Sequence, residues 1–179
     1  MSTVQKIYNN TCTEKIKKKN LIIHKMDVVV FDLDQTVVDS SHRTPFCDGK
    51  LDVVGYISLQ TRENIYKDKI LPLGFKMQNA FAQSYVVICT ARIMTKDDYD
   101  FLQDNGLKFH EIYERGNVSP YIASLTDGEY KSKCLNKFKN IEYTFYDDSD
   151  EVIKTFQTYS NVKMIDAKIE NKKLADVKS

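Results

Sequence analysis

The sequence lacks the segments by which proteins span membranes or are carried across them. No apolar run of about 18 residues occurs, which excludes an ordinary transmembrane helix. The first 20 residues are polar and rich in lysine, without the apolar centre of a signal peptide. No internal repeat and no proline- or serine-rich linker divides the 179 residues. We therefore expect a single cytoplasmic domain, which the length also suggests.

Paired cysteines and a phosphate-binding glycine loop are also missing. The cysteines, which form no C-x-x-C pair or zinc-ligand spacing, are Cys12, Cys47, Cys89 and Cys134. We interpret them as free thiols in a reducing compartment. No G-x-x-x-x-G-K-[ST] motif occurs, because Gly49-Lys50 lacks the rest of it, so a P-loop kinase is excluded. Hydrophobic residues at 42% and charged residues at 28% indicate an ordinary globular protein.

Positive charge is concentrated at the N-terminus. Residues 1–26 carry six lysines and one acid, out of 26 basic and 25 acidic residues in the chain. Residues 27–179 therefore retain 20 basic and 24 acidic groups, a net charge of −4. Such a body is poorly suited to non-specific nucleic-acid binding, which needs clustered lysine and arginine. We divide the chain into a basic N-terminal extension, residues 1–25, which is either a solvated tail or a contact for a polyanion, and a main domain, residues 26–179.

Strand-like and helix-like segments alternate along the main domain. The expected strands are short apolar runs at 28–31, 85–89, 109–113, 142–146 and 162–165. Helical patterns lie between them. One begins at Pro72, one has a capping box from Thr95 to Asp98 and ends at Gly106, one contains Leu135, and one begins near Ser149. The alternation predicts βαβ units with a parallel sheet, an α/β fold.

Residues 40–70 interrupt this alternation. They are polar and contain Pro45 and Gly49, residues typical of loops. We expect an insertion here, with a short helix near Thr61–Leu71.

Chemically reactive side chains follow three of the expected strands. The segments are Asp32-Leu33-Asp34-Gln35-Thr36, Thr90-Ala91-Arg92 and Asp147-Asp148-Ser149-Asp150. The carboxyl ends of parallel strands meet at one edge of a sheet, where ligands bind. Carboxylates crowded there repel one another unless a cation binds, and hard oxygen ligands favour Mg²⁺. The candidate metal ligands are Asp32, Asp34, Asp147 and Asp148.

The same edge offers the groups that phosphoryl transfer needs. A carboxylate approaches a phosphate ester only when cations neutralise the repulsion, and Mg²⁺ and the Lys131 ammonium would do so. Asp32 is then a nucleophile that forms an aspartyl-phosphate intermediate. Asp34 would protonate the leaving alkoxide and later accept a proton from water. The hydroxyl of Thr90 would hold a phosphate oxygen.

Four segments resemble the motifs of haloacid-dehalogenase-like (HAD) phosphatases. FDLDQTVVDS is similar to the first motif, D-x-D-x-[TV], and VVICTAR to the second. YKSKCLNKF is similar to the third motif, with its lysine, and FYDDSDEV to the acidic fourth. All four occur in family order within residues 27–166. The resemblance implies a HAD-like, Rossmann-type three-layer fold with a central parallel sheet and a small lid insertion, residues 40–70. The sequence departs from the family at Gln35, where glycine is usual.

Within that superfamily, the chain most resembles the phosphatase domain of bacteriophage polynucleotide kinase–phosphatases. The likeness includes residues beside the shared motifs: Arg43, Arg92, Asp127 and the Asp147-Asp148 doublet. It implies that the two arginines help to bind substrate and that the aspartates organise the metal and Lys131. The hydroxyl of Thr36 is a further candidate substrate-binding group.

Two assignments have competing interpretations. Lys131 and Lys133 both suit the ammonium role, and the spacing to the following apolar residues favours Lys131. Ser149 and Asp150 suit the start of a helix, as N-cap and first-turn acid, without any chemical role.

These features predict a Mg²⁺-dependent phosphomonoesterase that acts through an aspartyl-phosphate intermediate. The resemblance implies nucleic-acid 3′-phosphate ends or nucleotides as substrates, which a short lid would admit. The scarcity of basic residues weakens the polymer version, so a phosphatase of a free mononucleotide or another small metabolite is the first alternative. A catalytically silent module that holds a partner is the second, although every catalytic residue type is present.

Overall fold

A central parallel sheet of five strands organises the molecule, in the order β7-β6-β1-β8-β9. The computed structural model describes residues 26–116 and 124–177; the basic extension, with Cys12, lies outside the described residues. The strands are β1 (Asp27–Phe31), β6 (Ser84–Cys89), β7 (Glu111–Tyr113), β8 (Tyr143–Asp147) and β9 (Val162–Asp166). Each expected strand is present, and every neighbouring pair in this sheet is parallel.

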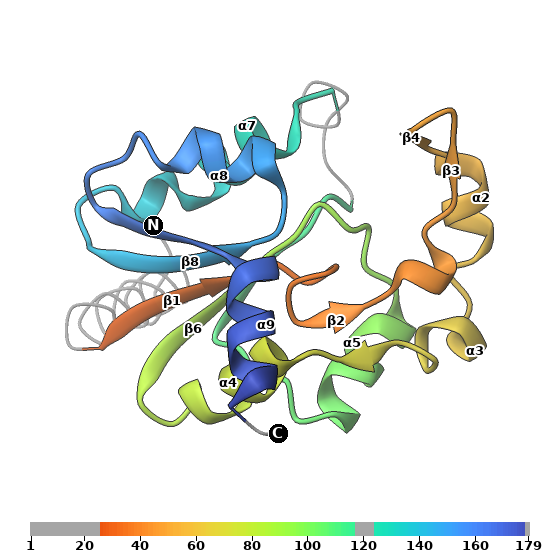
Figure 1. Cartoon of the computed structure of the whole chain (residues 1–179), viewed down its shortest axis with the longest axis horizontal. Helices are drawn as coiled ribbons and strands as arrows, with labels where there is room; N and C mark the ends of the chain where they lie inside the picture. The colour runs from red at the N-terminus through yellow and green to blue at the C-terminus, as the bar shows by residue number, and fades with distance from the viewer. Residues whose placement is uncertain (1–25, 117–123, 178–179) are drawn as a thin grey trace, which may run out of the picture.

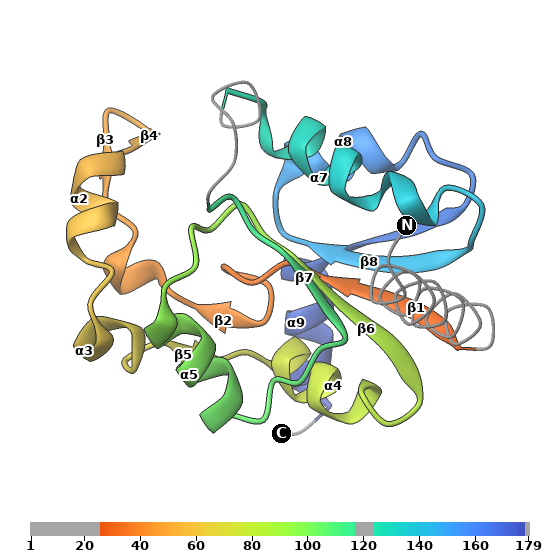
Figure 2. The ribbon, with the colours of Figure 1, turned by 180° about the vertical axis from the view of Figure 1, so that it is seen from behind.

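Helices cover both faces of the sheet, which confirms the three-layer α/β fold (Figures 1 and 2). One face packs against α4 (Pro72–Ala80), α5 (Lys96–Asp104) and α9 (Ala167–Asp176). The other packs against α7 (Asp127–Leu135), the 3₁₀ turn η2 (Asn136–Phe138) and α8 (Asp150–Phe156). The sheet therefore divides the interior into two hydrophobic cores.

Alternation along the strands decides which side chains enter which core. In β1, Val28 and Val30 belong to the core beneath α7 and α8, whereas Phe31 belongs to the core beneath α4 and α5. Because both of their faces are buried, the central strands β1 and β6 are mainly apolar rather than alternating with polar residues. Asp32 continues the series of Val28 and Val30 and lies on the α7 side of the sheet, where it bonds Lys131.

The segment between β1 and α4 forms short elements of its own. A two-stranded antiparallel sheet joins β2 (Val38–Asp39) to β5 (Lys69–Ile70), and a second joins β3 (Phe46–Cys47) to β4 (Lys50–Leu51). The helical pieces are η1 (Ser41–Arg43), α2 (Val53–Ser58) and α3 (Arg62–Ile65). We call residues 40–70 the insertion lobe; its β3, β4 and α2 stand beside the sheet rather than on either face (Figure 1).

The helix predicted near Thr61–Leu71 is wrong in its extent. The helix α3 ends at Ile65, and Lys69 and Ile70 form a strand instead. Leu71 precedes Pro72 and is extended, as the proline ring requires of the residue before it. Pairing with β2 satisfies the backbone groups that the helix would otherwise have satisfied.

The predicted helix boundaries are confirmed where a capping residue marks them. Thr95 and Asp98 form a reciprocal capping box at the start of α5. Gly106 follows the end of that helix with φ of +65°, a conformation that suits glycine. Ser149 caps α8. Cys47, Cys89 and Cys134 are free thiols, and no described helix is long and apolar enough to cross a bilayer.

Candidate active site

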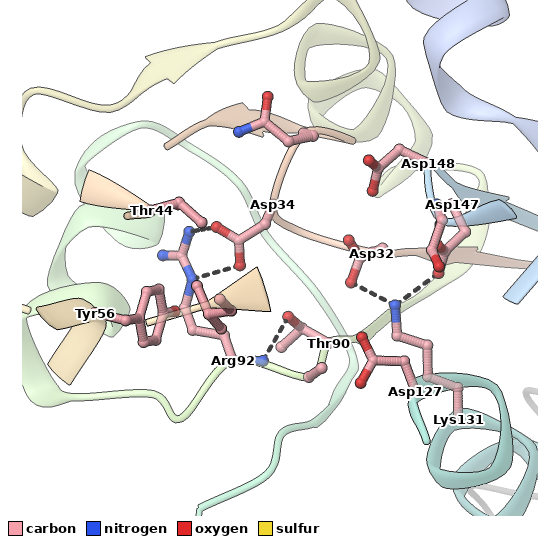
Figure 3. Close-up of a pocket in the computed structure, with 14 residues that line it drawn as sticks. Asp32, Asp34, Thr44, Tyr56, Thr90, Arg92, Asp127, Lys131, Asp147 and Asp148 are labelled. Carbon is pink, nitrogen blue, oxygen red and sulfur yellow. Dashed lines mark hydrogen bonds and ion pairs between the residues drawn. The ribbon is translucent and has the colours of Figure 1, made fainter. Parts of the chain in front are cut away.

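A cleft of about 230 Å³ lies at the carboxyl ends of β1, β6 and β8. Eight of the predicted site residues line it together: Asp32, Asp34, Thr90, Arg92, Asp127, Lys131, Asp147 and Asp148. Figure 3 shows their side chains converging from separate strands and from α7. The expectation that the strand ends meet at one edge is therefore confirmed by their positions.

An ammonium bridges two carboxylates at the centre of the cleft. The Lys131 Nζ donates to Asp32 Oδ1 at 2.8 Å and to Asp147 Oδ2 at 2.7 Å (Figure 3). All three side chains are buried. Burial raises the pKa of Asp32, and Lys131 only partly offsets this effect. Burial would lower the pKa of Lys131, but Asp32 and Asp147 raise it above its ordinary value, so the lysine stays charged.

Three carboxylates in the cleft are placed to hold a divalent cation. Asp32, Asp147 and Asp148 each offer an oxygen, and these oxygens lie within 4.8 Å of one another. Burial raises the pKa of Asp148 to about 6, and the charge of Asp147 adds to this effect. Hard oxygen donors with an excess of negative charge fit Mg²⁺. The carboxylate of Asp34 does not belong to this group, in contrast to its predicted role as a ligand.

Asp34 is instead paired with Arg92. The Arg92 Nε donates to Asp34 Oδ2 at 3.0 Å, a second guanidinium nitrogen donates to Oδ1, and the Ser40 hydroxyl donates to the same carboxylate. Arg92 is itself held by Asp98 Oδ1 at 2.8 Å. Burial would raise the pKa of Asp34, but Arg92 lowers it to about 2, so this group is ionised. A fork-like pair of this kind fixes the direction of the carboxylate.

Arg43 and Thr36 lie away from the cleft lining. The Arg43 side chain is fully buried, and its Nε and Nη2 donate to Asp68 at 2.8 and 2.7 Å. A third donor bonds Gln60 Oε1 at 2.6 Å. Thr36 is also fully buried, and its carbonyl accepts from Asn171. The positions of these two residues therefore do not favour the substrate contacts that the resemblance implies. Arg43 instead ties parts of the insertion lobe together.

The remaining predicted residues lie where the motifs expect them. The Thr90 hydroxyl accepts the backbone N–H of Arg92 at 3.1 Å, which leaves its own hydrogen to donate into the cleft. Asp127 accepts from Arg115 at 2.8 Å at the start of α7. Lys131 lines the cleft, whereas Lys133 is exposed on the same helix. Gln35 has φ of +56°, the left-handed conformation that explains why glycine is usual there.

Sequence reasoning missed three cleft residues from the insertion lobe and one buried acid. The lobe residues are Thr44, Leu51 and Tyr56. No periodicity marks them, because the elements around them are only two to six residues long. Asp98 was recognised as a capping residue, and its second carboxylate oxygen holds Arg92. The sequence offers only an acid three residues after a helix cap, and that pattern does not distinguish the capping role of Asp98 from its contact with Arg92.

The chain shares its fold with HAD-like hydrolases. Solved structures share the fold: a chain of the Pnkp1/Rnl/Hen1 RNA repair complex has a TM-score of 0.59 at 15% identity over 79% of this chain. This chain spans only 42% of that one. A haloacid dehalogenase-like hydrolase from Streptococcus pneumoniae has a TM-score of 0.54 at 13% identity, over 82% of this chain and 91% of its own.

The sequence comparisons are more specific than the fold. Residues 16–177 match the model of the bacteriophage T5 5′-deoxynucleotidase family. The 5′-deoxynucleotidase of Escherichia phage T5 is 31% identical over 172 residues, covering 83% of this chain and 70% of that protein. The chain belongs to this family.

Proposed function

We propose that this protein is a Mg²⁺-dependent phosphatase of nucleoside 5′-monophosphates, with deoxynucleotides as the favoured substrates. The observation that carries the proposal is the cleft in which Asp32 lies beside a charged lysine and two further carboxylates. The choice of a nucleotide as substrate is supported by the family match, because the relative in phage T5 is a 5′-deoxynucleotidase. The match favours the mononucleotide over a nucleic-acid 3′-phosphate end.

In the first half-reaction, an Asp32 carboxylate oxygen attacks phosphorus, and the bond from phosphorus to the ester oxygen breaks. Asp32, Asp147 and Asp148 would hold the Mg²⁺, which supplies positive charge that offsets the phosphate dianion. The Lys131 ammonium adds to this charge, and the Thr90 hydroxyl donates to a phosphoryl oxygen. The product is an aspartyl-phosphate with a nucleoside as leaving group.

Asp34 handles the protons of both half-reactions. In the second one, water attacks the phosphoryl group, Asp34 accepts the water proton, and Asp32 is released with inorganic phosphate. The ion pair with Arg92 keeps Asp34 ionised and ready for this step. To protonate the leaving oxygen in the first half-reaction, Asp34 must first take up a proton from solvent, which requires its contact with Arg92 to loosen in the substrate complex.

The charge distribution supports a small substrate rather than a polymer. Among the described residues that line the cleft, the basic ones are Arg92 and Lys131, and carboxylates already engage both. A nucleic-acid strand would need further lysine and arginine contacts along its backbone. Residues 40–70 supply one wall of the cleft, and we propose that they act as the small lid over a mononucleotide.

Phosphate release from thymidine 5′-monophosphate with Mg²⁺ tests the proposal. We expect turnover that is abolished by a chelator and by Asp32→Asn, while Asp150→Asn retains it. Asp150 is a matched control, because it is an exposed acid in the same segment as Asp147 but lies outside the cleft lining. Turnover of a 3′-phosphorylated oligonucleotide in preference to the mononucleotide would overturn the substrate assignment, and full activity of Asp32→Asn would overturn the mechanism.

A further inference from the structure

The cleft has two chemically different ends. Asp32, Lys131 and the metal-binding carboxylates occupy one end, and residues of the insertion lobe occupy the other (Figure 3). Asp34 lies between them, and Tyr56 lies beyond Asp34 on the side of Arg92. This order has a direct chemical meaning, because each group along it meets a different part of a phosphate ester.

The position of Asp34 fixes the direction in which the substrate extends. In the proposed function the phosphoryl group lies at Asp32 and the leaving oxygen lies at Asp34. The rest of the leaving group must then continue past Asp34, away from the metal-binding carboxylates. Tyr56 lies in that direction, on the side of Arg92, and lines the same cleft (Figure 3).

The wall at this end suits a flat, weakly polar group. Tyr56 comes from the short helix α2, and Leu51 comes from the adjacent strand β4. The Leu51 side chain is 42% exposed, so it offers apolar surface to whatever enters the cleft. Burial and the charge of Asp34 raise the pKa of Tyr56 to about 12, so the ring stays neutral beside a phosphate ester. Aromatic rings that flank such a site bind nucleobases by stacking.

We propose that Tyr56, together with Leu51, forms the nucleobase-binding wall of the cleft and determines specificity for nucleotides over other phosphate esters. This inference rests on the proposed function and adds the residue that recognises the leaving group. Tyr56 takes no part in the phosphoryl transfer itself. Its removal should weaken binding of substrates that carry a base and leave substrates without a base unaffected.

The test compares thymidine 5′-monophosphate with 2-deoxyribose 5-phosphate, which lacks the base. Stacking contributes about 1–3 kcal/mol per base, so Tyr56→Ala should raise KM for the nucleotide by about 5- to 150-fold. KM for deoxyribose 5-phosphate should stay within about twofold. Tyr56→Phe keeps the ring and should resemble the wild type on both substrates.

A control variant and the behaviour of the wild type separate this inference from misfolding of the insertion lobe and from failure of the proposed function. Val54→Ala changes an exposed residue of the same helix that does not line the cleft, and it should leave both KM values unchanged. If Tyr56→Ala raises KM equally for both substrates while the wild type still hydrolyses thymidine 5′-monophosphate well, the role of Tyr56 is overturned and the proposed function is not. A wild-type enzyme that hydrolyses deoxyribose 5-phosphate or an aryl phosphate but no nucleotide would overturn the proposed function and this inference together.

Discussion

Lys131 is the residue on which the electrostatics of the cleft depend. Its ammonium neutralises two buried carboxylates that would otherwise repel each other, Asp32 and Asp147. The pKa of Lys131 is raised above its ordinary value of 10.5, so while Asp32 and Asp147 are ionised the stabilisation is complete below pH 10.5. It is lost as the pH rises further, through the pKa of the folded state.

Replacing Lys131 should cost both stability and activity. Lys131→Met leaves two buried carboxylates without a partner, and breaking a buried pair in this way costs about 3–5 kcal/mol. We expect the free energy of unfolding, measured with urea at pH 7 without metal, to fall by about that amount. Lys133→Met, at an exposed position of the same helix, should change it by less than about 1 kcal/mol. Equal stability of the two variants would contradict the role given to Lys131.

Arg43 offers a second test at the residue scale, because its position argues against the substrate contact implied by the motif resemblance. Arg43→Met removes the hydrogen-bonded partner of Asp68 and leaves it a longer contact with Arg92 at 3.6 Å, so the free energy of unfolding should fall by about 3 kcal/mol. In protein that stays folded, KM for the nucleotide should remain within about twofold. A tenfold rise in KM at unchanged stability would restore substrate binding as the function of Arg43.

At the scale of elements, the edge strand β7 is held by a histidine at its start. The backbone N–H of Val86 donates to the ring Nδ1 of His110 at 3.1 Å, and the backbone N–H of His110 donates to the Val86 carbonyl at 2.8 Å. The ring stacks between Phe81 and Tyr85, with centroids 4.5 and 4.7 Å away. Nδ1 accepts a hydrogen bond only when it carries no proton, so the arrangement requires neutral histidine.

Acid should loosen this edge of the sheet. Burial lowers the pKa of His110 below its ordinary value of 6.5, so its stabilisation is present above pH 6.5 and is lost as the pH falls through the folded pKa. His110→Phe keeps a stacked ring without the acceptor. At pH 7.5 it should be less stable than the wild type by less than about 1 kcal/mol, because the ring is partly exposed. The difference should shrink towards pH 5 in urea unfolding; a constant difference would contradict this explanation.

The elements also explain how far the sequence could predict the site. The central strands were predictable because strands buried on both faces are mainly apolar, and the acids at the ends of β1 and β8 mark where these two strands end. The position of Lys131 followed from a recognisable motif and from the spacing to the apolar residues after it. The insertion lobe was not predictable, because strands of two residues have no periodicity. Tyr56 could not be placed for the same reason, and the burial of Arg43 depends on Asp68 and Gln60 from that lobe.

At the scale of the whole molecule, a bound divalent ion should stabilise the folded protein by linking the ends of β1 and β8. The carboxylates that would hold it come from β1 and from the end of β8, so binding favours the folded state over the unfolded chain. Mg²⁺ at a hundred times its dissociation constant should add about 2.7 kcal/mol to the free energy of unfolding.

Thermal unfolding with Mg²⁺ and with a chelator tests this coupling. An increase of that size corresponds to a rise in Tm of about 5–10 °C for a chain of this length. Asp147→Asn should abolish the response to Mg²⁺, whereas Asp150→Asn should keep it. A response that survives in Asp147→Asn would place the ion elsewhere.

The most direct measurement is to trap the phosphorylated enzyme. The enzyme is mixed with Mg²⁺ and thymidine 5′-monophosphate, quenched in acid during turnover, digested and analysed by mass spectrometry for phosphate on the peptide that contains Asp32. We expect the phosphate on Asp32 in the wild type, and neither the modified peptide nor turnover in Asp32→Asn. Sustained turnover by Asp32→Asn, or phosphate carried on a different residue, would contradict the central claim that Asp32 is the nucleophile.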